Sequence, residues 1–204
     1  LLKGGGTDYT ATSGTSVVLA TGASVSDVIE IIVYDVFSVG NFYSRTDSDS
    51  RFVRHDSATA GTDNFIAGNN AGDAIQSGGN YNTVVGNEAG TAITTGDRNT
   101  AVGFEALKTV STGSFNVAVG YQALENNTGD NNTAVGDQAL EANTSGSNNV
   151  AVGDDAGVNI TSGNKNTLIG TLAGDALTDA DENVAVGYNA LGADVNGSRS
   201  VAIG

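Results

Sequence analysis

The chain has 204 residues and a formal net charge of −15, with 29 glycines and no proline, cysteine, methionine or tryptophan. A chain this acidic is repelled by phosphate and by anionic membrane surfaces, which argues against non-specific nucleic-acid binding and attachment to such membranes. The lack of cysteine excludes a disulfide framework, a thiolate zinc site and a cysteine nucleophile, and one histidine, His55, cannot build a multi-histidine metal site.

Residues 1–46 predict part of a small β-module. Two apolar runs, 16–20 and 28–34, are typical of strands. Two strands alone do not make a stable domain, so we expect that the module's earlier strands were cut away from a longer protein. The second run, extended to residue 37, is interrupted by Glu30 and Asp35 and is too short to cross a bilayer, so no membrane insertion is expected. The polar residues 47–61 are expected to form a linker.

Residues 62–204 are dominated by a repeat. Its five-residue core reads Asn, Thr or Val, a small or apolar residue, Val or Ile, and Gly, with a degenerate first copy at Asn64 and a last copy at Ser200. Successive core glycines are 18, 17, 17, 16, 17, 17, 17 and 17 residues apart. An alanine follows three residues after each core Gly, and most copies have a second Gly nine or ten residues after it. The regular core residues are Asn82, Asn99, Asn116, Asn132, Asn149, Asn166 and Asn183, with Gly86, Gly103, Gly120, Gly136, Gly153, Gly170 and Gly187.

This period predicts an all-β solenoid. The unit is too short for a helix pair, and β-branched residues punctuated by Gly and Asn favour short strands and turns. We expect two strands of four to five residues in each coil, and about eight coils that pair with one another in succession. At a strand spacing of about 4.8 Å, eight coil steps make a rod of about 40 Å.

The core strand also predicts self-association. In Thr-Ala-Val the first and third side chains point one way and the alanine points the other, so both faces are apolar or small. A strand that is apolar on both faces is buried on both, but a thin solenoid has only one interior. The simplest solution is a homo-oligomer around an axis, with the small alanines where the chains approach. The alternative is a monomeric solenoid with an exposed apolar strip.

The repeated asparagines and the repeated glycines both have structural interpretations. Stacked asparagines can form hydrogen-bonded ladders between coils, and Asn tolerates turn geometry. We expect the glycines, in the core and in the second column, to mark backbone positions with positive φ.

No motif predicts catalysis, a metal or a cofactor. The acidic groups at Asp154–Asp155 and Asp179–Glu182 are expected to be solvated in turns, whereas a glycosidase needs two carboxylates that face each other across a sugar. The nine-residue calcium-binding repeat is absent, and His55 lies in the expected linker. No nucleophile-elbow sequence frames a serine, and the glycines follow the repeat rather than forming a phosphate loop.

One variable position is a candidate contact surface. The residue after the core Gly changes from copy to copy, which predicts exposure, and it is Phe104 and Tyr121 in neighbouring coils and Tyr188 further on. Adjacent exposed aromatic rings can stack on sugars or contact protein. The alternative is packing at a coil corner or between subunits.

The repeat resembles two known kinds of fibrous protein. Ser-Val-Ala-Ile-Gly at 200–204 resembles the head repeat of trimeric autotransporter adhesins, and the longer unit at 132–146 is closer still to repeats of phage tail fibres. Upstream, residues 8–19 and 26–32 look like a β-module of cyanophage tail fibres. The repeats cover residues 64–204, about 70% of the chain.

The resemblance implies a left-handed parallel β-roll with three chains around one axis. It implies a virion fibre outside the cell that contacts other tail proteins and a glycan or protein receptor on the host surface. The sequence departs from the pattern at Leu168, which replaces an Ala, and at Ala180, which replaces a second Gly. The long and short coils predict local bulges near Gly79 and Gly129.

Other functions stay open on the sequence alone, among them a monomeric solenoid that binds ice or a glycan. A bacterial trimeric adhesin head uses the same kind of repeat. An ice-binding solenoid calls for a flat Thr-x-Thr array, whereas each core strand here has at most one Thr. A polysaccharide depolymerase built on a right-handed β-helix needs wider coils than 17 residues to form a cleft.

Overall fold

The computed structural model describes residues 9–13, 16–19, 53–55 and 61–204, and in these residues all regular secondary structure is β-strand. The chain divides into two compact units, Leu1–Phe42 and Tyr43–Gly204. In the first unit, β1 (Tyr9–Ser13) and β2 (Ser16–Leu19) form an antiparallel hairpin. Strand β2 confirms the strand expected over 16–20, whereas β1 was not predicted. The strand expected over 28–34 lies outside the described residues.

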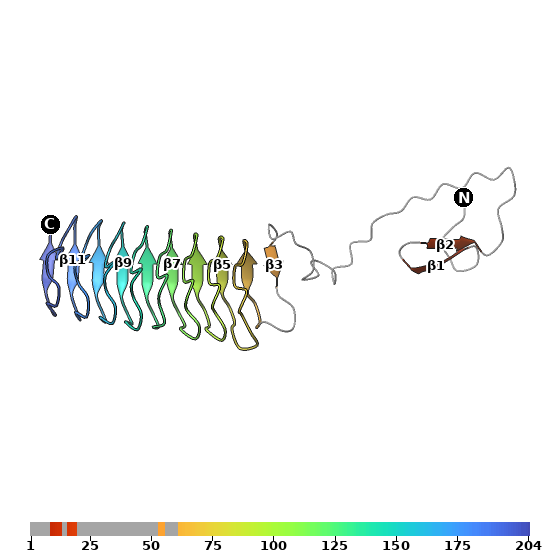
Figure 1. The fold of residues 1–204 in the computed structure, drawn as a ribbon, viewed down its shortest axis with the longest axis horizontal. Helices are drawn as coiled ribbons and strands as arrows, with labels where there is room; N and C mark the ends of the chain where they lie inside the picture. The colour runs from red at the N-terminus through yellow and green to blue at the C-terminus, as the bar shows by residue number, and fades with distance from the viewer. Residues whose placement is uncertain (1–8, 14–15, 20–52, 56–60) are drawn as a thin grey trace. The chain divides into compact units, whose positions relative to one another are not determined.

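The second unit is built on one ten-stranded sheet that runs in chain order, as Figure 1 shows. Its strands are β3 (Val53–His55), β4 (Phe65–Ala67), β5 (Thr83–Val85), β6 (Thr100–Val102), β7 (Val117–Val119), β8 (Thr133–Val135), β9 (Val150–Val152), β10 (Thr167–Ile169), β11 (Val184–Val186) and β12 (Val201–Ile203). From β4 to β12 every pair of neighbours is parallel, and each coil of the chain supplies one strand. The predicted parallel β-solenoid of about eight coils is therefore confirmed.

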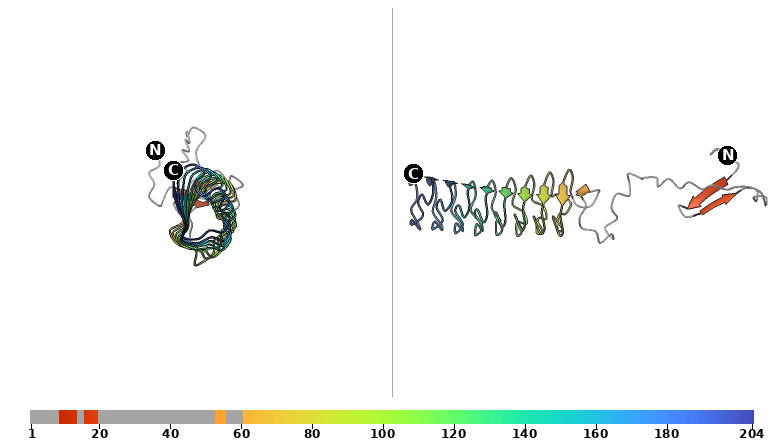
Figure 2. Two further views of the ribbon diagram at one scale, coloured as in Figure 1. Left: turned by 90° about the vertical axis from the view of Figure 1, so that its left-hand side faces the viewer. Right: turned by 90° about the horizontal axis from the view of Figure 1, so that it is seen from above.

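The repeats stack in strict register. Equivalent core residues pair with each other, as Thr100 does with Val117 and Ala101 with Ala118. Viewed along the axis in Figure 2, the coils superimpose closely. The long and short coils leave this strand register unbroken, so the irregularities near Gly79 and Gly129 are confined to the turns. In the long coil, Gly79 rather than Gly78 accepts the hydrogen bond of the core Asn64, and Gly78 is the extra residue with φ +116°.

Each coil contains one strand of three residues, not the two longer strands expected from the sequence. The rest of the coil is turn, and its backbone N–H groups donate to the next coil's carbonyls, as Leu107 does to Ala123 and Thr109 to Glu125. The physical reason is a set of left-handed backbone positions: every described non-glycine residue with positive φ falls in one of three columns of the repeat. These columns are the residue before the core Asn, the second residue after the core Gly and the residue after the alanine column.

The first coil is covered by a strand that was expected to be linker. Strand β3 pairs antiparallel with β4, with Val53 opposite Ala67 and His55 opposite Phe65. The expected linker over 47–61 is therefore wrong at these three residues. An antiparallel neighbour satisfies the edge of β4, which would otherwise present unpaired N–H and C=O groups.

The interior of each coil is narrow and is filled in two alternative ways. The residue after the alanine column is either Leu or Gly, and where it is Gly the residue three positions later is Ile or Leu. In the second coil a Cβ on Gly90 would lie 2.8 Å from Ile93 Cδ1 and 3.2 Å from Val84 Cγ1, so these two side chains occupy the space of a Leu. The third coil instead has Leu107 there, with the smaller Ala101 and Val110, all fully buried.

Leu168, the departure from Ala noted in the sequence, has the same explanation. A Cβ on Gly157 would lie 2.6 Å from Leu168 Cδ1, and one on Gly174 would lie 2.8 Å from its Cδ2. The larger side chain at 168 therefore fills the space above two glycines, in its own coil and in the preceding one.

Candidate functional site

The outward side of the parallel sheet forms a continuous uncharged surface, here called the outer strand face. The middle residue of strands β4 to β11 is buried, whereas the first and third are partly or largely exposed. The exposed fraction is 37% for Val135 and for Val152 and 41% for Ile169. The members of the face are Phe65, Ala67, Thr83, Val85, Thr100, Val102, Val117, Val119, Thr133, Val135, Val150, Val152, Thr167, Ile169, Val184, Val186, Val201 and Ile203.

This arrangement corrects one expectation. The strand alanines, such as Ala118 and Ala151, are fully buried inside the coil and do not lie on the outward surface. Alanine is inside because the coil also has to hold the buried alanine column and one larger side chain. Any contact between chains at this sheet would therefore be made by Thr, Val and Ile.

The core asparagines form the predicted ladder. Asn149 is fully buried; its backbone N–H donates to Asn132 Oδ1 (3.0 Å) and its Nδ2 donates to the Gly163 carbonyl (2.7 Å). Its own Oδ1 accepts the backbone N–H of Asn166 (2.9 Å). The contacts to the neighbouring asparagines repeat along the whole column, which is formed by Asn64, Asn82, Asn99, Asn116, Asn132, Asn149, Asn166 and Asn183. The amides hold each coil to the next and close each coil on itself.

The two glycine columns are required for different reasons. The core glycines have positive φ, as expected; Gly120 has φ +139°, and a Cβ there would lie 2.1 Å from the Gly136 carbonyl oxygen. Of the second column only Gly78 has positive φ, at +116°, so the expectation is wrong for the other members. At Gly129 the obstacle is contact alone, because a Cβ would lie 2.1 Å from the Gly146 carbonyl oxygen.

A second polar ladder was missed by the sequence analysis. The residue after the second Gly accepts a backbone N–H from the preceding coil through a side-chain oxygen: Asp97 accepts from Asn80 (2.7 Å) and Ser114 accepts from Asp97 (3.0 Å). The column is Asn80, Asp97, Ser114, Asp130, Ser147, Asn164, Asp181 and Ser198. The signal was a short side chain with an oxygen at every copy, in three residue types.

The aromatic pair expected on neighbouring coils is present. The rings of Phe104 and Tyr121 stack with centroids 5.6 Å apart and an angle of 9° between their planes. They are 41% and 47% exposed, and Tyr188, four coils beyond Tyr121, is 73% exposed. The structure thus brings the first two candidate contact residues together and leaves the third apart.

An ion-pair network lies beside these rings. Lys108 Nζ contacts a carboxylate oxygen of Glu105 and lies 3.1 Å from Glu88 Oε2. Gln122 Nε2 donates to the other Glu105 oxygen at 2.7 Å. The hydrogen bond from Lys108 is the main cause that lowers the pKa of Glu105, and the same pairing raises the pKa of Lys108. Both groups therefore stay charged near neutral pH.

A second mixed row lies before the core strands. The Arg98 guanidinium lies 5.2 Å from the centroid of the Tyr81 ring in the preceding coil and 5.3 Å from that of Phe115 in the following one. Sequence reasoning did not find this cation–π sandwich. Further along the same column, Glu182 Oε2 lies 3.1 Å from Arg199 Nε, and Glu182 Oε1 lies 3.6 Å from Lys165 Nζ. Arg199 is the main cause that lowers the pKa of Glu182.

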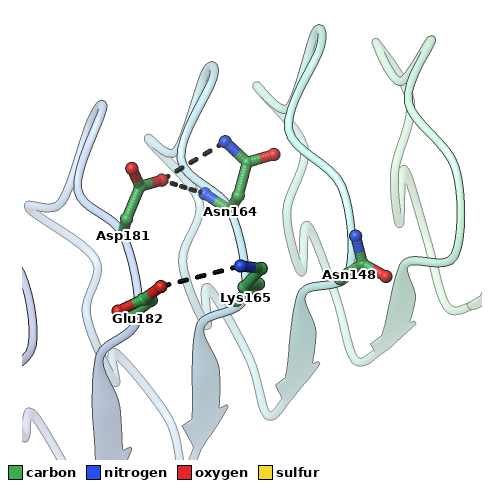
Figure 3. Close-up of a pocket in the computed structure, with 5 residues that line it drawn as sticks. All are labelled: Asn148, Asn164, Lys165, Asp181 and Glu182. Atoms are coloured by element: carbon green, nitrogen blue, oxygen red, sulfur yellow. Dashed lines mark hydrogen bonds and ion pairs between the residues drawn. The ribbon is translucent and has the colours of Figure 1, made fainter.

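A shallow surface depression borders this column, and Figure 3 shows its residues as Asn148, Asn164, Lys165, Asp181 and Glu182. The Asn164 amide and backbone N–H both point to Asp181, at 3.2 and 2.6 Å. Because the facing groups already pair with each other, the depression offers few free donors or acceptors to a ligand.

The acidic groups named in the sequence have structural partners or are spread over the surface. Asp179 accepts hydrogen bonds from the Thr161 and Ser162 hydroxyls at 2.7 and 2.8 Å, which lower its pKa. Burial, followed by the charge of Asp154, raises the pKa of Asp155. Within the described ranges, no group of three or more acidic or histidine side chains is placed to hold a metal ion. His55 lies in β3.

No family model, curated protein or solved structure matches this chain. None of the described residues form a helix long and apolar enough to cross a membrane.

Proposed function

We propose that the chain is a structural and adhesive segment of a trimeric viral tail fibre that contributes to host-cell recognition and attachment, without catalysis. In this proposal the solenoid is a left-handed roll, and three copies pack around one axis. The observation that carries the proposal is the outer strand face, an uncharged row in which Thr, Val and Ile side chains predominate from β4 to β12.

Charge favours a second copy of the chain as the occupant of this face. Chains of net charge −15 repel one another, and an uncharged surface adds no local repulsion when two copies meet there. The outer strand face has no acidic or basic residue from β4 to β12. Burial of its aliphatic side chains would contribute about 25 cal/mol per Å² of apolar surface removed from water.

The spacing of the face supports the same occupant. Equivalent residues recur at every coil in unbroken register, so an identical chain presents the same axial repeat and can match it along the whole rod. Closed symmetric assembly of such a rod gives a fibre with no exposed sheet face. The likeness of residues 132–146 and 8–19 to phage tail-fibre sequences favours a virion over a bacterial surface adhesin, which remains the alternative.

Light scattering after size exclusion tests the assembly. We expect a mass three times 20.3 kDa. The variant Val152→Glu, which places a charge on the outer strand face, should lower the mass to that of one chain and leave the coil interior intact. Thr112→Glu adds the same charge at an exposed turn position and should remain trimeric. A wild-type chain that is folded and monomeric would overturn the proposal.

A further inference from the structure

Every aromatic ring of residues 61–204 is on the outside of the solenoid. Large aromatic side chains normally supply much of a protein's core, but the coil interior is filled by Ala, Val, Ile and Leu. The six rings are between 41% and 73% exposed. They are Phe65, Tyr81, Phe104, Phe115, Tyr121 and Tyr188. The aromatic residues of this unit therefore contribute little to its interior, and their role has to be sought at the surface.

The stacked pair Phe104 and Tyr121 forms a raised block on this surface. The residues after the core Gly follow one another through backbone hydrogen bonds: Glu105 N–H donates to Asn87, Gln122 N–H to Phe104, and Gln138 N–H to Tyr121. The neighbours of the pair in the column are therefore Asn87 on one side and Asp137 on the other, both exposed. Their side chains are shorter than an aromatic side chain, and the two stacked rings keep 41% and 47% of their surface exposed.

Each end of the block is consequently a step from an aromatic ring to a shorter polar residue. Tyr121 has the exposed Asp137 as its neighbour in the column, and Phe104 has the exposed Asn87. Further polar side chains lie beside the rings. Glu105 forms an ion pair with Lys108 and accepts a hydrogen bond from Gln122 Nε2 at 2.7 Å. These contacts restrict the side chains beside the rings, and restriction before binding lowers the entropic cost of binding.

We propose that this step binds a neutral hexose oligosaccharide, and the inference rests on the proposed attachment function. A pyranose ring has a face of C–H groups that fits an aromatic wall, and a rim of hydroxyls that fits carboxylate and amide groups. A protein partner would need a much larger continuous surface than two rings between polar neighbours. The nearby carboxylates of Glu88, Glu105 and Asp137 would repel an anionic glycan, and the one adjacent cation, Lys108, is already paired.

The test uses the full chain with maltohexaose, cellohexaose and mannohexaose as neutral probes and hexagalacturonic acid as the anionic comparison. Saturation-transfer NMR and tyrosine fluorescence report binding; the chain has no tryptophan to mask the fluorescence. We expect at least one neutral hexaose to bind and the anionic one to bind more weakly. Phe104→Ala and Tyr121→Ala should each weaken binding about two- to tenfold. Tyr188→Ala removes an exposed ring that has no stacked partner among the described residues; it is the matched control and should bind as wild type does.

Three results would overturn the site. They are no binding of any neutral hexaose at the highest soluble concentration, unchanged binding by both ring variants, and a loss of oligomer mass in the ring variants, which would make the rings a subunit contact. The solution mass of the wild type separates this inference from the proposed function. A trimer that binds no hexaose removes only the sugar site, whereas a monomer that binds one removes only the trimer.

Discussion

The two ways of filling a coil can be exchanged by design. The second coil has Val84, Gly90 and Ile93 in its interior, whereas the third has Ala, Leu and Val at the same positions. The triple variant Val84→Ala/Gly90→Leu/Ile93→Val gives the second coil the interior of the third. The backbone permits the change, because Gly90 has φ +53° and Leu107, its equivalent, has φ +51°.

The single substitutions should each destabilise the fold. Gly90→Leu places a side chain where Ile93 Cδ1 and Val84 Cγ1 lie 2.8 and 3.2 Å from the first added carbon, and such overpacking costs about 1–3 kcal/mol. Ile93→Val costs about 0.5–1.5 kcal/mol, and Val84→Ala, which removes two methyl groups, costs about 2 kcal/mol. If the three sites were independent, the triple variant would lose about 3.5–6.5 kcal/mol.

Because the triple variant matches the total side-chain volume to within one carbon atom and reproduces the interior of the third coil, we expect it to lose less than about 1.5 kcal/mol. Urea unfolding followed by circular dichroism gives the free energy of unfolding of each variant, measured at one chain concentration because association also stabilises. An interaction energy of about 2 kcal/mol or more across the set supports mutual compensation. A triple variant as unstable as the sum of its singles would refute it.

Three further outcomes follow from the described contacts. Asn149→Ala should cost about 2–6 kcal/mol in urea unfolding, because it leaves the buried Asn166 N–H without its acceptor and the Gly163 carbonyl without its donor, whereas exposed Asn69→Ala should change little. Gly120→Ala should lower the thermal midpoint by more than either, since the added carbon would lie 2.1 Å from a backbone oxygen; an unchanged midpoint would contradict this packing. Burial raises the pKa of Asp155, so its charge opposes folding above that pKa and the penalty disappears as pH falls through it. Asp155→Asn should therefore raise the midpoint at pH 7 and have less effect in acid, and an equal effect at both pH values would argue against the shift.

The sequence predicted the coil repeat because its spacing is a direct consequence of stacking. It did not predict the number of strands per coil, because the left-handed positions are occupied by ordinary residues such as Glu105, Leu107 and Phe115. Residue type alone favours Gly or Asn at such positions, and here the stacked neighbours impose the conformation instead. The short strand over 53–55 was missed because its residues look like a polar linker, although they pair with β4.

Some features of the candidate sites were predictable from the sequence and others were not. The asparagine ladder was predictable because a buried amide that both donates and accepts permits few substitutes. The ladder at Asp97 and Ser114 was not, since any short side chain with an acceptor oxygen serves. The inward direction of the strand alanines depended on the volume of the whole coil, which no single strand reveals. The Phe104–Tyr121 pair was predictable because equal position in adjacent coils means adjacency in space.

The difference between positions that depend on neighbouring coils and positions that do not shows which residues of the rod can change without loss of the fold. Inside the coil and along both ladders, each residue is held by the coil before or after it, so a change at one position requires a second change nearby, as Leu168 shows above two glycines. At the position after the core Gly, backbone pairing is independent of the side chain, and that position contains Asn, Asp, Thr, Phe and Tyr in one register. A rod of this kind can therefore acquire a new surface group at one coil without repacking the others. That freedom is what an attachment fibre needs if its contact residues change while its length and symmetry do not.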